Sequence, residues 1–161
     1  MEDWKAFYEK ICDIKFTMLV THDHLGQMQA RPFTTQAAGN EGAVWFLSRL
    51  DSEAVKEIQN DGNVLLCYAD TSENRFISTV GHATLSQERA DIASLWKPAD
   101  ELFFPEGKDD PAIVVVRVEV LRADIWDSDK SRMEKLLIMA KAAAGMDADP
   151  RDLGRHEVLE K

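Results

Sequence analysis

The sequence predicts an α+β protein, mainly β with flanking helices, whose centre is a six-stranded antiparallel β-barrel. Six segments have the period of two or the continuous apolar run that is typical of strands. Three of them precede the first internal helix in hairpin order, which favours an antiparallel barrel. The strand–helix–strand alternation of a doubly wound parallel sheet is missing. A chain of 161 residues is long enough for one hydrophobic core.

The N-terminal part is expected to be a short helix followed by a β-hairpin. A helix over residues 2–12 is predicted by apolar side chains at helical spacing: Trp4, Phe7, Tyr8 and Ile11. The period then becomes two, which predicts a strand with one face carrying Ile14, Phe16, Met18 and Val20. Residues 22–26 read as a turn and 27–36 as the returning strand.

The middle of the chain is expected to alternate strands with two helices. Asp51 is a good N-cap residue for the first of these helices. The predicted order is a turn at 38–42, a strand at 43–48, a helix to about residue 60, strands at 64–69 and 75–85, and a helix over 87–96.

The last third begins with the longest predicted strand, residues 112–123, whose Ile/Val run is expected to be buried on both faces. An amphipathic helix is predicted from Ser128 to about Ala144, closed by Gly145. The domain is therefore expected to span residues 1–145. No element is assigned to the polar C-terminal tail, residues 146–161, and its order is left open.

Composition argues against several classes of partner. There are 29 Asp and Glu residues against 19 Lys and Arg, a net charge of −10, and no basic stripe offsets it. Such a charge repels phosphate backbones, so no nucleic-acid partner is expected. No apolar run is long enough to span a membrane, and no secretory segment opens the chain, so a cytoplasmic protein without a membrane partner is expected.

The common metal and nucleotide motifs are missing. His22 and His24 have a spacing that two metal ligands can have. However, no third ligand is near in sequence, and the segment is expected to be an exposed turn. Neither G-x-G-x-x-G nor the P-loop pattern occurs. The sequence predicts no metal site and singles out no catalytic acid or base.

The segment from Ser48 to Lys56 carries the most suggestive local pattern. A buried strand ends here and a helix begins, and Ser52 and Lys56 lie on one face of that helix. Hydroxyls, cations and free backbone amides at a helix N-terminus are the groups that hold a phosphate. Plain capping by Asp51, with Lys56 solvated, explains the same pattern, so both interpretations stay open.

Several short motifs, in matching order, resemble the pyridoxamine-phosphate-oxidase-like FMN-binding split barrels, in particular their general stress protein branch. The resemblance extends over roughly residues 5–145. The motifs are Met18-Leu-Val-Thr, Ala30-Arg-Pro-Phe33, Val44-Trp-Phe-Leu-Ser48 with Asp51-Ser52, Ile77-Ser-Thr-Val-Gly-His82, Leu95-Trp-Lys-Pro, Phe104-Pro-Glu-Gly-Lys-Asp-Asp-Pro-Ala112 and Ala123-Asp-Ile-Trp-Asp127.

The resemblance implies a split barrel that forms a homodimer and binds FMN at the subunit interface, with FAD or another flavin as the alternative cofactor. It implies that Arg31, Pro32 and Phe33 lie along the edge of the isoalloxazine ring. Trp126 matches a family tryptophan that approaches the flavin from the partner subunit.

The same resemblance assigns the remaining cofactor contacts to the strand and helix around residue 50. Phe46, Leu47 and Ser48 are expected to line the ring and the ribityl chain, and Ser52 to meet the phosphate. Of these residues, Ser48 and Ser52 also belong to the phosphate-type pattern found from spacing alone.

Two departures from the family pattern bear on the cofactor. The family commonly has a lysine two residues after this serine, where this chain has Ala54. Two alternatives stay open: Lys56 substitutes from further along the helix, or the affinity for the phosphate is reduced. Position 33 is Phe where methionine is common. The C-terminal segment of true pyridoxamine-phosphate oxidases is absent, which argues against vitamin B6 oxidation.

The leading functional hypothesis is an FMN-binding protein of the general stress type that acts as an oxidoreductase on a small substrate. Two alternatives stay open. One is a non-enzymatic flavin carrier or stress-linked sensor, and the other is a barrel that has lost its cofactor, which Ala54 and the acidic residues at the helix start would explain.

Overall fold

The computed structural model describes residues 4–127, 132–148 and 154–161. Its strands are β1 (Phe16–His22), β2 (Met28–Thr34), β3 (Ala37–Ala38), β4 (Ala43–Arg49), β5 (Asn63–Asp70), β6 (Arg75–Ser86), β7 (Ile113–Asp127) and β8 (Arg155–Glu160). Its helices are α1 (Trp4–Ile14), η1 (Asn40–Gly42), α2 (Glu53–Asn60), α3 (Arg89–Leu95), η2 (Pro98–Leu102) and α4 (Arg132–Ala143).

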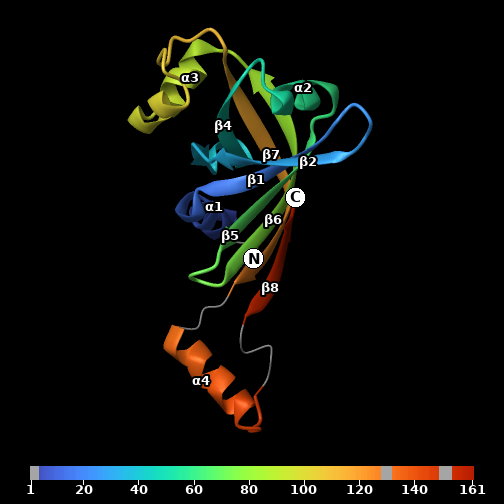
Figure 1. Cartoon of the computed structure of the whole chain (residues 1–161), viewed down its shortest axis with the longest axis vertical. Coiled ribbons are helices and arrows are strands. Elements are labelled where there is room, and N and C mark those ends of the chain that lie inside the picture. Colours follow the sequence, from blue (N-terminus) through green and yellow to red (C-terminus); the bar gives the residue numbers. More distant parts are fainter. Residues whose placement is uncertain (1–3, 128–131, 149–153) are drawn as a thin grey trace.

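The strands form one antiparallel sheet that curls into a half-barrel (Figure 1). The order is β2-β1-β5-β6-β7-β4-β3, and β8 pairs with β7. Helices α1, α2 and α3 flank the sheet, whereas α4 stands away from it beyond the ends of β7 and β8 (Figure 1). The fold is the predicted α+β split barrel, mainly β with flanking helices.

The number of strands in the described residues is eight, so the prediction of six is wrong. Strand β3 has two residues, too few for a period to show, and lies at the start of the predicted turn. Strand β8 lies in the tail to which no element was assigned. Its sequence Arg-His-Glu-Val-Leu-Glu is mostly polar because it is an edge strand. Among the side chains of β8 that the structure describes, only Leu159 is buried.

Strand β7 holds the sheet together. Its first half pairs with β4 and its second half with β8 along the same edge, while β6 covers the other edge. Residues Ile113 to Val116 are all buried, as predicted. Val116 packs in the main core, whereas Ile113 and Val115 pack on the opposite face against Ile92 of α3.

The chain reverses direction at Lys15, whose φ of 71° separates α1 from β1. Helix α1 therefore extends to Ile14, the residue at which the sequence pattern predicted the start of the strand. The two faces of β1 alternate as predicted, but Leu19 and its neighbours Thr17 and Thr21 face the core, whereas Phe16 is 60% exposed. The apolar face of this strand is thus the outer face of the barrel.

Strand β6 bends at Gly81. The pairing with β7 shifts register between Val80 and Gly81, which marks a β-bulge. A Cβ at Gly81 would lie 2.6 Å from the carbonyl oxygen of Glu119 and 2.5 Å from Val118. Glycine is therefore required at this bend because the two strands approach too closely for a side chain.

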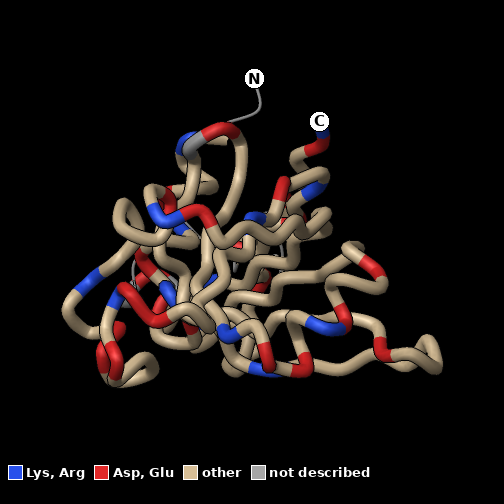
Figure 2. The backbone as a smooth tube through the Cα atoms, turned by 90° about the horizontal axis from the view of Figure 1, so that it is seen from above, with Lys and Arg blue, Asp and Glu red and all other residues tan. Residues whose placement is uncertain are grey.

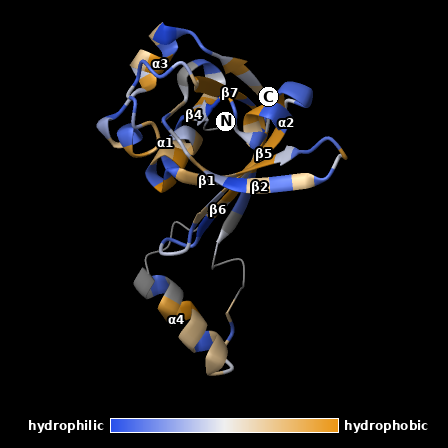
Figure 3. Cartoon of the chain, turned by 45° about the horizontal axis from the view of Figure 1, so that its top comes forward, coloured by the Kyte–Doolittle hydropathy of each residue, from blue (hydrophilic) through white to orange (hydrophobic). Residues whose placement is uncertain are grey.

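Charge and hydropathy vary over the surface. Acidic and basic positions are interspersed along the chain rather than gathered by sign (Figure 2). Helix α4 carries exposed apolar residues, among them Leu136, Leu137 and Met139 (Figure 3). The predicted helix start at residues 128–131 lies outside the described residues. No helix among those described is both long and apolar enough to cross a bilayer.

Candidate functional site

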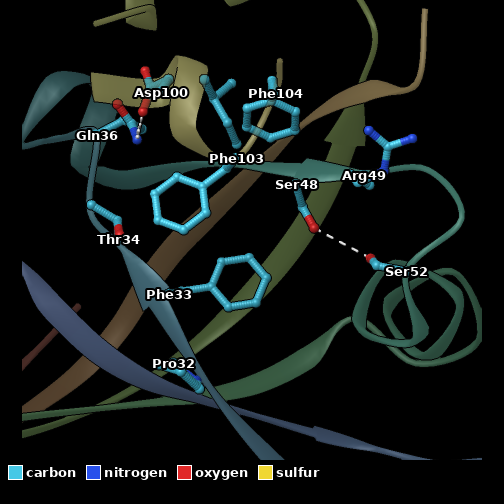
Figure 4. A pocket seen from close by; sticks show the side chains of 11 residues that line it. Pro32, Phe33, Thr34, Gln36, Ser48, Arg49, Ser52, Asp100, Phe103 and Phe104 are labelled. Carbon is cyan, nitrogen blue, oxygen red and sulfur yellow. Dashed lines mark hydrogen bonds between the residues drawn. The ribbon is translucent and has the colours of Figure 1, made fainter. Parts of the chain in front are cut away.

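A cavity of about 290 Å³ opens between β2, β4, the start of α2 and the η2 segment (Figure 4). Aromatic side chains form its middle and polar side chains its two ends. The lining residues are Pro32, Phe33, Thr34, Gln36, Leu47, Ser48, Arg49, Ser52, Asp100, Phe103 and Phe104.

The middle of the cavity is built by aromatic rings. Phe33 from β2 and Phe103, which follows η2, both extend into it (Figure 4). Behind Phe33 lies the fully buried Phe46 of β4, and the two ring centroids are 5.6 Å apart with the planes at 89°. Phe103 is 64% exposed, so one wall of the cavity opens to solvent. Such walls suit a flat aromatic ligand.

One end of the cavity is a pair of serine hydroxyls. Ser48 lies near the end of β4 and Ser52 at the N-cap of α2, with their Oγ atoms 3.2 Å apart. The backbone N–H of Val55 donates to Ser52 Oγ at 3.3 Å. Ser52, rather than the predicted Asp51, therefore caps this helix. Asp51 instead accepts a hydrogen bond from Arg49 at 3.2 Å.

The serine end can bind an anion through hydrogen bonds more readily than through net charge. The first-turn amides of α2 have no acceptor within the helix, and the helix dipole is positive here. Arg49 lines the cavity, but its guanidinium also contacts Asp110 at 3.3 Å. Lys56 Nζ lies 2.9 Å from Glu53 Oε1, so both nearby cations are paired with carboxylates.

The other end of the cavity is a buried amide and carboxylate. Gln36 Nε2 donates to Asp100 Oδ1 at 2.9 Å, and the backbone N–H of Lys97 donates to Asp100 Oδ2 at 2.7 Å. Lys97 Nζ donates to the backbone oxygen of Gln36 at 2.7 Å. These bonds attach the η2 segment to the chain between β2 and β3.

The structure brings together five of the residues that the resemblance assigned to the cofactor. All five line the cavity: Pro32, Phe33, Leu47, Ser48 and Ser52. Phe46 lies behind the lining. The Arg31 guanidinium is engaged elsewhere, donating to Glu57 at 2.7 Å and to the hydroxyl of Thr21. Lys56 lines a neighbouring cavity with Glu57 rather than this one.

Trp126 lies far from the cavity of its own chain. It is near the end of β7, whereas Ser48 pairs with Val114 near the start of that strand, about 40 Å away at the usual rise per residue. Its ring stacks on His156 of β8 with centroids 4.8 Å apart. His156 and Asp124 lie 3.0 Å apart, and the hydrogen bonds from Arg122 and His156 lower the pKa of Asp124.

Sequence reasoning missed the lining residues that come from distant segments. Thr34 and Gln36 continue from Pro32 at a period of two, which was a usable signal. Asp100 and Phe103 carry no local pattern, because only the fold brings η2 to β2. Among the described residues, no three His, Cys, Asp or Glu side chains are arranged to hold a metal ion.

A family model described as "Pyridoxamine 5'-phosphate oxidase like" matches residues 2–149. A general stress protein 26 structure from Jannaschia sp. CCS1 is 19% identical with a TM-score of 0.81, each chain covered fully. A general stress family protein from Xanthomonas campestris is 25% identical with a TM-score of 0.66, covering 81% of this chain and 93% of that one.

A third solved structure is described by its cofactor. The pyridoxamine 5'-phosphate oxidase-related, FMN binding protein from Nostoc punctiforme is 12% identical with a TM-score of 0.62, covering 79% of this chain and 85% of that one. At these identities the likeness concerns the fold. Comparison with curated proteins gave no match.

Proposed function

The chain belongs to the pyridoxamine 5'-phosphate oxidase-like family, and from this premise we propose that it binds FMN in the cavity between β2, β4 and α2. The observation that supports this proposal most strongly is that the middle of the cavity is aromatic while one end holds the Ser48–Ser52 pair at a helix N-terminus. FMN has the matching parts, a flat ring system and a phosphate. The relative from Nostoc punctiforme, described as FMN binding, supports the same reading.

Each part of the cofactor has a counterpart in the cavity. Ser48 and Ser52, with the free amides of the first turn of α2, would hold the phosphate. Phe33 and Leu47 would pack on the ring and the ribityl chain, with Pro32 at the ring edge. Bound FMN would supply electron-transfer chemistry, and the protein would orient the ring and limit its contact with water.

Two residues of the predicted set would act from behind the lining. Phe46 supports Phe33 by its edge-to-face contact. Arg31 is held by Glu57 and Thr21, so its contribution would be to fix the backbone of β2 beside the ring rather than to contact FMN with its guanidinium.

The size of the cavity favours a site shared between two chains. Ligand cavities usually measure about 300–1,000 Å³, and the 290 Å³ enclosed here is small for a cofactor as large as FMN. We therefore propose a homodimer in which the second copy completes the site.

The outer face of the sheet offers the surface for that second copy. Strand pairing places Phe76 beside Trp126, and Trp126 beside His156, on this face. Six apolar side chains on it are more than a third exposed: Phe16, Met18, Phe76, Val80, Trp126 and Val158. Exposed apolar side chains that gather on one face of a sheet typically mark an interface. A two-fold dimer through this face would carry each Trp126 to the other protomer's cavity, which it cannot reach in its own chain.

We propose that the loaded protein is an oxidoreductase acting on a small molecule that stacks on the flavin. A second candidate, a barrel without cofactor, is favoured by one observation. Arg49 and Lys56, the cations nearest the serine end, are both paired with carboxylates, and Ala54 stands where the family commonly has lysine.

Titration of the purified protein with FMN, FAD and a deazaflavin decides between these candidates. We expect FMN to shift the visible absorbance and to raise Tm at one equivalent per chain, with light scattering giving twice the chain mass. An unchanged spectrum and an unchanged Tm at saturating FMN would overturn the proposal and leave the barrel without cofactor.

A further inference from the structure

A buried acceptor lies at the end of the cavity away from the serine pair (Figure 4). Gln36 lines the cavity with only 9% of its surface exposed, and its side-chain oxygen Oε1 is enclosed without a hydrogen-bond partner among the described residues. Burying a carbonyl oxygen unpaired is unfavourable, so native proteins rarely leave one without a donor. A ligand N–H would satisfy this oxygen when the side chains that enclose it move aside on binding.

The orientation of this amide is fixed by its neighbour. Asp100 Oδ1 lies 2.9 Å from Gln36 Nε2, and a carboxylate only accepts hydrogen bonds. The amide nitrogen must therefore face Asp100, and the oxygen must be the free atom. Rotating the amide would relieve the oxygen only by placing it against the carboxylate.

Asp100 makes this end of the cavity rich in acceptors. It is 5% exposed and also lines the cavity. Its two recorded donors, Gln36 and the backbone of Lys97, leave further lone pairs on the carboxylate. The ammonium of Lys97 is used by the backbone oxygen of Gln36. Lys97 does not line the cavity, so a ligand group that enters here meets the oxygen atoms of Gln36 and Asp100 and the negative charge of Asp100.

We propose that Gln36 and Asp100 form a subsite for an uncharged N–H donor, an amide or an imide, and that this end of the cavity rejects carboxylates and phosphates. The aromatic rings of Phe33 and Phe103 would hold the ring to which such a group is attached. The two ends of the cavity thereby differ in preference, with the anion at Ser48 and Ser52 and the N–H donor at Gln36.

Two sources can supply the N–H donor to this subsite. The first is the imide N–H of the flavin ring, and this source rests on the proposed FMN binding. The other is an amide group on a second small molecule that occupies the cavity beside the cofactor. The experiment therefore has one arm for each source.

The first arm needs no flavin. Benzamide and benzoate share a ring and differ in the group offered to Gln36. We expect the protein to bind benzamide at least about tenfold more tightly than benzoate, by ligand-observed NMR titration. Gln36→Met should weaken benzamide binding and so narrow the difference, while the remaining charge of Asp100 still disfavours benzoate. The matched control Gln29→Met, an exposed position on β2, should leave benzamide binding unchanged.

The second arm compares FMN with its N3-methyl derivative, which lacks the imide N–H. If the flavin is the source, methylation weakens binding about tenfold in the wild type and not in Gln36→Met. If a second molecule is the source, methylation has no effect and benzamide binds to the FMN-loaded protein.

The outcomes separate the two proposals. Failure of FMN to bind overturns the proposed function, and the benzamide arm still decides the subsite. The subsite is overturned if the wild type shows neither a preference for benzamide nor a cost of N3-methylation. Both of these comparisons use the wild-type protein, so they hold even if Gln36→Met does not fold.

Discussion

The hydroxyls of Ser48 and Ser52 lie 3.2 Å apart, joining the end of β4 to the first residue before α2. Ser52 Oγ also accepts the N–H of Val55, which caps the helix. A hydroxyl has one hydrogen to donate and two lone pairs to accept with. Ser52 can therefore keep its capping bond and still donate to a phosphate oxygen, so the two interpretations of this segment, cap and anion site, are compatible.

Ser48→Ala and Ser52→Ala should separate those roles. We expect both variants to weaken FMN binding about tenfold without changing riboflavin binding, because riboflavin lacks the phosphate. Ser52→Ala alone should also lower the free energy of unfolding, by about 1 kcal/mol for the lost cap. Flavin titration and urea denaturation measure the two effects. Equal losses for riboflavin and FMN would contradict a phosphate role.

Ala54→Lys tests the departure from the family pattern. Ala54 is 5% exposed and packs in the main core, so a lysine there must bend out of the core to reach the serine end. We expect FMN to bind more tightly, because a cation is added near its phosphate, while Tm falls. The control Ala54→Met has similar bulk without charge and should lower Tm without the gain. No gain for lysine would mean that the missing lysine does not limit affinity.

The residues of the candidate cavity that could be named from the sequence lie close together in the chain. Pro32 and Phe33 are adjacent, and Ser48 and Ser52 are four residues apart, so local pattern and family motif pointed to them, and the structure places all four in the lining of one cavity. Gln36 and Asp100 are 64 positions apart, and their hydrogen bond exists only because η2 folds back against β2. No local periodicity encodes such a contact.

The face of β1 that meets the core could not be read from the sequence either. Phe16 and Met18 are the larger apolar side chains, yet they lie outside, while Thr17 and Thr21 are buried. Alternation defines two faces but does not say which is the core when both are covered. An outer face that packs on a second chain would have the composition of a core.

Met18→Arg should dissociate the proposed homodimer. Met18 is 42% exposed on the outer face of β1, and a charge within the proposed apolar interface would be buried without a partner. We expect light scattering to give twice the chain mass for the wild type and one chain mass for the variant, with FMN affinity reduced. Leu25→Arg, at the exposed β1–β2 turn, is the control and should stay dimeric. A dimeric Met18→Arg variant would place the interface elsewhere.

Gly81→Ala should destabilise the barrel. The new Cβ would approach the carbonyl oxygen of Glu119 to 2.6 Å, so β6 and β7 must separate at the bulge. We expect a loss of about 1–3 kcal/mol in the free energy of unfolding, measured by urea denaturation. Thr84→Ala, an exposed position on the same strand, should cost much less. An unchanged stability in Gly81→Ala would mean that the bend adjusts at little cost.

Salt should strengthen FMN binding. The chain carries a net charge of −10, and Asp51 and Glu53 flank the proposed phosphate position. The nearby cations are already paired, so the phosphate meets a field that is repulsive overall. Raising the ionic strength from about 0.02 M to about 0.3 M shortens the screening length to well under about 10 Å and weakens this repulsion. We therefore expect FMN affinity to rise with salt and riboflavin affinity to stay constant.

The opposite trend for FMN alone would mean that Arg49 leaves Asp51 and Asp110 to pair with the phosphate, because an attraction between opposite charges is the interaction that salt weakens.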